Sequence, residues 1–245
     1  MNGNPFGVAA PVAQPEFDFG VKKYPKIKAW SYSTVNNFTK CPLSIRFNKI
    51  DRIPEPDNEA QARGNAIHAD LAHLIRTGEW PERPTIPHRD EWRKRLLHMH
   101  VAGARAELQH AFDRQWQTVP WFGVNVYGRV IIDAILDAGD TVILHEHKSG
   151  KYWPEHEKQK RLYGLVAMMM YPNAEQSLVQ INYIDQPDQA TDIARFTREQ
   201  IPELKAEFDE FALPLLSEEI YPASPGRHCG RCSYAKTAGG PCVHG

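Results

Sequence analysis

Asp133, Glu146 and Lys148 form the first set of residues whose types and spacing suit catalysis. Glu146 and Lys148 lie two positions apart in an extended segment, so their side chains point to one face of a strand. Asp133 lies in the preceding extended segment, which a short turn brings alongside. Paired carboxylates bind hard divalent cations, and a neighbouring lysine can position or deprotonate an attacking water. The set indicates metal-assisted phosphodiester hydrolysis, and a surface ion pair at the strand ends is the alternative interpretation.

Three more residues could extend this set. His68 follows Gly64 by four positions in a helical segment, where an imidazole serves either as a buried core group or as a fourth metal ligand. Gln159 and Tyr163 are also four positions apart, so they share one face of the helix that follows Lys148. That face would look toward the strand ends. Taken alone, each of the three is compatible with ordinary packing.

The cysteines form a second candidate site. Four cysteines in 245 residues are too few for a disulfide scaffold; they are Cys41, Cys229, Cys232 and Cys242. The Cys-x-x-Cys spacing lets two thiolates converge on one metal, and Cys242 can supply a third ligand. A fourth from Cys41 would suit a [4Fe–4S] cluster, whereas His228 or His244 would complete a zinc site. Reduced thiols without a metal are the third alternative.

The periodicity of apolar residues predicts the elements that position these side chains. Helices are expected over 31–41, 59–77, 88–117, 154–171 and 197–216, and strands over 124–127, 130–136, 141–147, 176–184 and 193–196. Gly78 should end the second helix, and Thr197 should cap the last one. This order predicts an α/β fold with a mixed β-sheet flanked by helices. We expect a single domain over residues 29–245, preceded by a flexible arm over residues 1–28.

The composition favours one class of protein, but the net charge does not identify a binding partner. Hydrophobic residues make up 42% and charged residues 24%, which is typical of a globular protein rather than a disordered one. The 29 basic and 30 acidic residues give a net charge near zero. This total does not exclude a local basic groove that binds nucleic acid. The longest apolar run is Leu165 to Met170, far below the roughly 18 residues of a membrane span. We therefore expect an intracellular protein without a membrane partner.

In this order, Gly64-x-x-x-His68, Asp133, Glu146-x-Lys148 and Gln159-x-x-x-Tyr163 resemble the RecB-like branch of the PD-(D/E)XK nuclease superfamily. The resemblance runs from about residue 31 to residue 244 and implies a restriction-endonuclease-like fold with N-terminal helices and a C-terminal cysteine knuckle. It implies that Mg²⁺ or Mn²⁺ binds to His68, Asp133, Glu146 and the backbone carbonyl of His147. Lys148 would be the catalytic lysine, and Gln159 and Tyr163 would contact DNA and support the site. The sequence departs from the family pattern at His147, where apolar or aromatic residues are commoner, and at Ser149-Gly150, where Thr-Gly is commoner.

The cysteines extend this resemblance. The iron–sulfur exonucleases of CRISPR adaptation and the AddB-type nuclease domain carry one cysteine before the nuclease motifs and three after them. The chain is similar in having Cys41 before and Cys229, Cys232 and Cys242 after, although the last gap is longer than usual. The resemblance implies a [4Fe–4S] cluster that clasps the two chain ends together, with Zn²⁺ as the alternative.

The resemblance favours a metal-dependent deoxyribonuclease that acts as an exonuclease on linear DNA, single- or double-stranded. Recombination, repair and phage or CRISPR DNA processing are the candidate pathways, with a helicase, a recombinase or another complex subunit as partner. We expect a cytoplasmic location, which includes a phage-encoded protein in a bacterial host.

Two alternative functions remain open from the sequence. The first is a DNA-binding or partner-docking module with a silent nuclease fold. The second is a zinc hydrolase that uses His145 and His147, whose side chains share the other face of the Glu146 strand. Four aromatic residues flank the strand ends, and we expect them to pack in the core rather than stack on bases; they are Trp121, Phe122, Tyr152 and Trp153.

Overall fold

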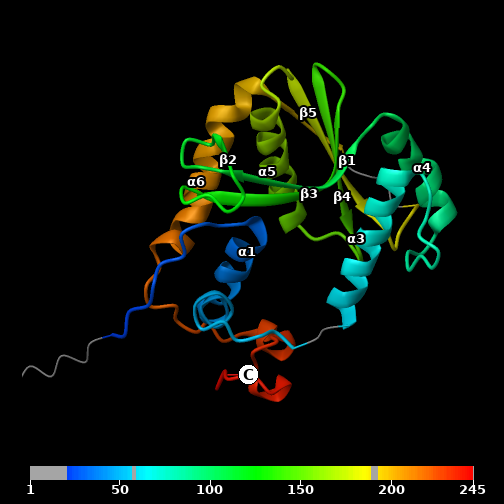
Figure 1. Ribbon diagram of the computed structural model, residues 1–245. Helices are drawn as coiled ribbons and strands as arrows, with labels where there is room; N and C mark the ends of the chain where they lie inside the picture. The colour runs from blue at the N-terminus through cyan, green and yellow to red at the C-terminus, as the bar shows by residue number, and fades with distance from the viewer. Residues whose placement is uncertain (1–20, 57–58, 189–192, 245) are drawn as a thin grey trace, which may run out of the picture.

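The computed structural model describes residues 21–56, 59–188 and 193–244. Its centre is a mixed sheet of six strands in the order β2-β1-β3-β4-β5-β6, with helices packed on both faces (Figure 1). The strands are β1 (Arg105–Phe112), β2 (Thr118–Val119), β3 (Gly128–Asp137), β4 (Thr141–Lys148), β5 (Gln176–Tyr183) and β6 (Ile193–Thr197). The helices are α1 (Tyr32–Lys40), α2 (Pro42–Ile45), α3 (Glu59–Thr77), α4 (Arg89–Val101), α5 (Glu155–Met170) and α6 (Ile201–Ser217). The expected α/β class with a flanked mixed sheet is confirmed.

The connection through α5 makes the sheet mixed. β4 and β5 are parallel along their whole length and α5 crosses between them, while the other neighbouring strands pair antiparallel. Helices α1, α5 and α6 bury the larger hydrophobic core on one face of the sheet, and α3 and α4 cover the other face (Figure 1). The end of β4 is therefore enclosed between α3 and α5.

Local side-chain and glycine signals determine where several elements begin and end. Helix α3 ends at Thr77, and Gly78 adopts the left-handed conformation with φ of 79° that terminates helices. The Ser31 side chain accepts a hydrogen bond from the Thr34 amide and caps α1. Thr197 forms a capping box with Gln200 at the start of the short 3-10 turn that leads into α6. The turn over residues 137–140 joins β3 to β4.

The prediction of one helix over 88–117 is wrong. Helix α4 ends at Val101, and the chain continues through Gly103, which has φ of 77°, into β1. The apolar spacing from Trp92 to His110 matches a helical period by coincidence, because it runs across this glycine. A glycine in this conformation stops a helix, and the segment that follows forms a strand beside β3.

The prediction of a strand over 124–127 is also wrong. Val124 and Asn125 form a turn, Val126 and Tyr127 have no regular structure, and β3 begins at Gly128. The Tyr127 amide does donate to the Phe112 carbonyl, and the Tyr127 carbonyl accepts from the Trp30 amide. Gly128 has no side chain, which leaves room for the Phe112 ring packed directly against it. The extended pairing therefore starts only where the backbone can approach this ring.

The expected arm over 1–28 falls partly outside the described residues, which begin at Val21. Residues 21–28 lie against the chain beyond α6: the Tyr24 amide donates to the Glu219 carbonyl, and the Tyr221 hydroxyl donates to the Pro25 carbonyl. Among the described helices, none is long and apolar enough to cross a membrane.

His110 gives the fold a testable dependence on pH. Its ring is buried in β1 and stacks on Phe112, and burial lowers the pKa of His110 to about 4. The unfolded chain binds this proton near pH 6.5, so the free energy of unfolding should fall as the pH drops from 6.5 to 4. We expect His110→Phe to reduce that loss by on the order of 2 kcal/mol, measured by urea denaturation at pH 7 and pH 5. Parallel pH profiles for the two proteins would contradict this assignment.

Candidate active site and metal centre

Asp133 lies where β3 and β4 separate. The ladder between the two strands runs from the Asp137–Val142 pair to the Ala134–His145 pair, and β4 then continues along β5 alone. The His147 amide, which would continue the ladder, instead donates to Asp133 Oδ2 at 2.7 Å. The carboxylate thus replaces a backbone carbonyl as acceptor, which satisfies a buried N–H group and fixes the side chain.

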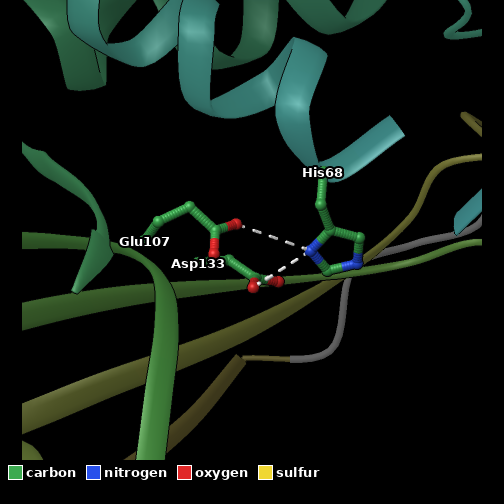
Figure 2. Close-up of side chains that lie close together, drawn as sticks. All are labelled: His68, Glu107 and Asp133. Atoms are coloured by element: carbon green, nitrogen blue, oxygen red, sulfur yellow. Dashed lines mark hydrogen bonds and ion pairs between the residues drawn. The ribbon is translucent and has the colours of Figure 1, made fainter. Parts of the chain in front are cut away.

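Three side chains from three elements converge at this point, as Figure 2 shows: His68 of α3, Glu107 of β1 and Asp133 of β3. His68 Nδ1 is 3.1 Å from Asp133 Oδ1 and 3.8 Å from Glu107 Oε1, and one ligand atom of each residue lies within 4.8 Å of the others. Oxygen and nitrogen ligands about 2.0–2.6 Å from one cation are separated by such distances. Within residues 21–56, 59–188 and 193–244, this is the one group of three such ligand atoms.

Glu107 is the residue of this group that the sequence prediction missed. Its neighbours pair as Ala106 with Ala134 and Leu108 with Ile132, so Glu107 lies opposite Asp133 in the sheet. The backbone of Glu107 has φ of 53°, the left-handed region, which side chains other than glycine rarely adopt inside a strand. Such strain costs about 1–3 kcal/mol and is typical of functional sites. The sequence feature that could have predicted this placement is Gly103. If the helix ends at this glycine, the segment that contains Glu107 is free to form a strand.

Glu146 and Lys148 lie on the face of β4 that looks toward α5. Lys148 Nζ donates to Glu146 Oε1 at 2.7 Å, and Gln159 Nε2 donates to the same oxygen at 2.9 Å. Gln159 also donates to the Tyr163 hydroxyl, which in turn donates to the Ile131 carbonyl of β3. The structure therefore brings Glu146, Lys148, Gln159 and Tyr163 into one hydrogen-bonded network, with the two α5 residues holding the glutamate in place.

Burial and mutual repulsion set the charges of the site. Burial and the Asp133 charge raise the pKa of Glu146 to about 7, against the opposing effect of Lys148. Burial and the same Asp133 charge raise the pKa of Glu107. Burial disfavours the charged form of His68, but its hydrogen bond to Asp133 and the surrounding carboxylates outweigh this effect and raise its pKa. Burial also opposes ionisation of Asp133, but the hydrogen bonds from His68 and the His147 amide lower its pKa.

His145 and His147 point to the α3 and α4 side of the sheet, away from Glu146 and Lys148. The Asn182 amide nitrogen lies 3.0 Å from His145 Nδ1 and 3.3 Å from His147 Nδ1. Burial lowers the pKa of His145 to about 3 and that of His147 to about 4, so both rings stay neutral at pH 7. The His145 ring packs against that of His98, and the His147 ring against that of His68.

A groove of about 600 Å³ opens beside the Glu146 network. Lys148, Gln159 and Tyr163 line it at the β4 end, and the N-terminus of α1 lines it elsewhere. Lys49 and Arg129 add two further cations to its wall. Cationic side chains and free backbone amides of a helix N-terminus both suit a phosphate backbone.

The expectation that the aromatic residues near the strand ends pack in the core is wrong for three of them. Phe122 is 89% exposed, Trp153 47% and Tyr152 43%, because they lie in loops that protrude from the sheet rather than on buried strands. Trp121 is half-buried and lines the groove, where the Arg129 guanidinium lies over its ring.

The C-terminal cysteines lie in a tail that packs against the segment following Cys41. Tyr234 lies between Cys232 and Cys242 and is buried against Phe47. Its hydroxyl accepts a hydrogen bond at 2.9 Å from the side-chain amide nitrogen of Asn48. The Cys242 amide donates to the Tyr234 carbonyl. All four cysteines are free thiols and half-buried.

The sequence profile of the PD-(D/E)XK nuclease superfamily matches residues 29–237, which covers the whole sheet and the candidate site. The chain belongs to the PD-(D/E)XK nuclease superfamily. This nuclease is similar to the crystal structure of SSO0001, with 14% identity, a TM-score of 0.46, and coverage of 90% of this chain and 88% of that one. It is also similar to a "Putative exonuclease" from Eubacterium rectale, with 10% identity, a TM-score of 0.43, and coverage of 82% and 86%. No curated protein matches the sequence.

Membership of this superfamily makes the chain a nuclease-type enzyme with DNA as its implied substrate. Nucleases of this superfamily typically use divalent metals such as Mg²⁺, and the acidic group around Asp133 is a candidate site for such an ion. The chemistry of the donors fits, because carboxylate oxygens and one imidazole nitrogen suit ions such as Mg²⁺ and Mn²⁺.

Gln159 offers a test of how the site is held together. Replacing it with leucine keeps its bulk but removes the amide that donates to Glu146 and Tyr163. Residues that hold a metal ligand typically contribute about 10–100-fold to metal affinity, so we expect Mn²⁺ affinity to fall by about that factor in calorimetric titration. Gln176→Leu is the control, since the Gln176 amide binds Thr141 at the opposite end of the sheet. Equal affinities for Gln159→Leu and wild type would argue against this role.

Proposed function

We propose that this protein is a metal-dependent DNA exonuclease that hydrolyses phosphodiester bonds of linear DNA. The observation that carries the proposal is the pairing of the buried Glu146, which interacts with Asp133, with Lys148, which lines the groove. Glu146 is only 4% exposed, yet within the described residues its Oε2 atom has no hydrogen-bond partner. A buried carboxylate oxygen left in this condition is costly unless a ligand satisfies it.

Each residue has a distinct part in this proposal. His68, Asp133, Glu146 and the His147 carbonyl would hold Mg²⁺ or Mn²⁺, and the bound cation supplies charge neutralisation at the scissile phosphate and a lowered pKa for a water. Lys148 orients the attacking water, or takes its proton, from the edge of the groove. Gln159 and Tyr163 keep Glu146 directed toward the strand ends, and both line the groove in which the DNA would bind.

The exonuclease assignment is supported by the order of motifs that the chain shares with the RecB-like branch. The groove supports a nucleic-acid substrate through the three cations in its wall, Lys49, Arg129 and Lys148. A silent DNA-binding module would retain the groove but would gain nothing from a buried Glu146–Lys148 pair, because desolvating both charges costs free energy.

We further propose that Cys41, Cys229, Cys232 and Cys242 hold a [4Fe–4S] cluster that ties the ends of the chain together. This proposal is supported by four half-buried free thiols on two segments that the contact between Tyr234 and Phe47 brings together. The Gly226 amide also donates to Cys229 Sγ, a contact that stabilises thiolate sulfur. A zinc ion held by the three C-terminal cysteines and His228 or His244 is the competing candidate.

A direct test follows end-labelled linear DNA beside a closed circle, with Mg²⁺, with Mn²⁺ and with chelator. We expect wild type to degrade the linear DNA only with metal and to spare the circle. Lys148→Met should lower the rate by about 100-fold or more, because it removes the group that positions the water. Lys94→Met, on the exposed surface of α4, is the control and should cleave as wild type does. Cleavage of the circle at the same rate would replace the exonuclease proposal with an endonuclease.

The cluster is tested by Cys41→Ser. If Cys41 is the fourth ligand, the purified variant should lose its iron, its visible absorption and several degrees of thermal stability. The measurements are iron and zinc content by mass spectrometry and a thermal melt. Unchanged iron in the variant would contradict the role of Cys41, and stoichiometric zinc in wild type would favour the zinc site.

A further inference from the structure

We propose that Glu107 is a metal ligand, and that it forms with His68 and Asp133 a cation site on the β1 side of Asp133. This inference rests on the proposed function in its choice of ion, and it adds a ligand from β1 to the set implied by the sequence motifs. The three ligand atoms come from α3, β1 and β3, so the site exists only in the assembled fold (Figure 2).

The geometry places Glu107 in reach of the same ion as Asp133. Its Oε1 lies 3.8 Å from His68 Nδ1, and Asp133 Oδ1 lies 3.1 Å from the same nitrogen. In contrast, Glu146 is not part of this group, and its Oε1 atom accepts hydrogen bonds from Lys148 and Gln159. Asp133 therefore lies between two sets of ligands, with Glu107 on one side and Glu146 on the other.

The neighbouring buried atoms point independently to a bound ligand. In the described part of the chain, Glu146 Oε2 and His147 Nε2 are both buried without a hydrogen-bond partner. Their residues are 4% and 1% exposed, and the His147 ring packs edge-on against the ring of His68. Unsatisfied buried atoms on Glu146, which interacts with Asp133, and on His147, which contacts His68, are expected where a cation and its water molecules bind.

The charge balance favours a cation at the same place. Around His68, the Asp133 carboxylate interacts electrostatically with both Glu107 and Glu146; Lys148 pairs with Glu146, and Arg76 partly offsets the charge at Glu107. Glu107 and Asp133 lie opposite each other on adjacent strands, an arrangement that is destabilising for like charges. A divalent cation between them would convert this repulsion into attraction.

The strained backbone of Glu107 provides a way to separate ligand binding from folding. Glycine adopts φ near 53° without penalty, so Glu107→Gly should fold at least as stably as wild type in the absence of metal. Glu107→Gln keeps the size of the side chain and one acceptor oxygen, but it replaces the other oxygen with an NH2 group and removes the charge. Arg52→Gly is the matched control, because Arg52 is exposed and has φ of 54° far from the three ligands in the sequence.

The experiment is calorimetric titration of each full-length protein with Mn²⁺, together with thermal melts with and without the ion. We expect Glu107→Gln and Glu107→Gly to bind Mn²⁺ at least about 10-fold more weakly than wild type, and to lose most of the stabilisation that Mn²⁺ provides. Arg52→Gly should bind as wild type does. Wild-type affinity in Glu107→Gln would overturn the proposal, as would the absence of Mn²⁺ binding by wild type.

A parallel DNA-cleavage assay separates this inference from the proposed function. Weakened Mn²⁺ binding in Glu107→Gln, with no cleavage by wild type, would support the ligand assignment and contradict the nuclease function. Cleavage by wild type, with unchanged Mn²⁺ affinity in Glu107→Gln, would leave the nuclease function in place and overturn the ligand assignment.

Discussion

The hydrogen bond from the His147 amide to the Asp133 carboxylate is the interaction on which the site depends. It ends the β3–β4 ladder without leaving a buried N–H group unpaired, and it opens the sheet at the point where Glu146 and Lys148 project. Because the remaining Asp133 oxygen faces His68, one side chain joins the sheet to α3. These hydrogen bonds lower the pKa of Asp133, so its carboxylate stays ionised and suits a candidate cation site.

The two layers of helices give this centre two different surroundings. On the α5 side, Gln159 donates to Glu146 and to Tyr163, and both α5 residues line a groove that also carries cationic side chains. On the α3 side, His68 and Glu107 surround the other oxygen of Asp133. The sheet thus presents carboxylates to both faces, and the Asp133 charge contributes to the raised pKa of both Glu107 and Glu146.

The sequence was informative where a single element determines the outcome. Local periodicity correctly predicted that Glu146 and Lys148 share one face of β4. It also predicted that Gln159 and Tyr163 share one face of α5, because each of these placements depends on a single element. Glu107 could not be found in this way. Its segment has a helical pattern of apolar residues, and only Gly103 interrupts it, so the strand follows from pairing with β3 across the sheet. The exposed Phe122 likewise lies in the loop before β3, which begins only at Gly128, where the Phe112 ring packs closely.

The most direct measurement is the anomalous diffraction of crystals soaked in Mn²⁺. If Asp133 organises a cation site, the anomalous map should show manganese about 2.0–2.3 Å from an Asp133 oxygen, with His68 and at least one of Glu107 and Glu146 as further ligands. Manganese bound only elsewhere on the protein, or none in fully soaked crystals that bind the ion in solution, would contradict the account.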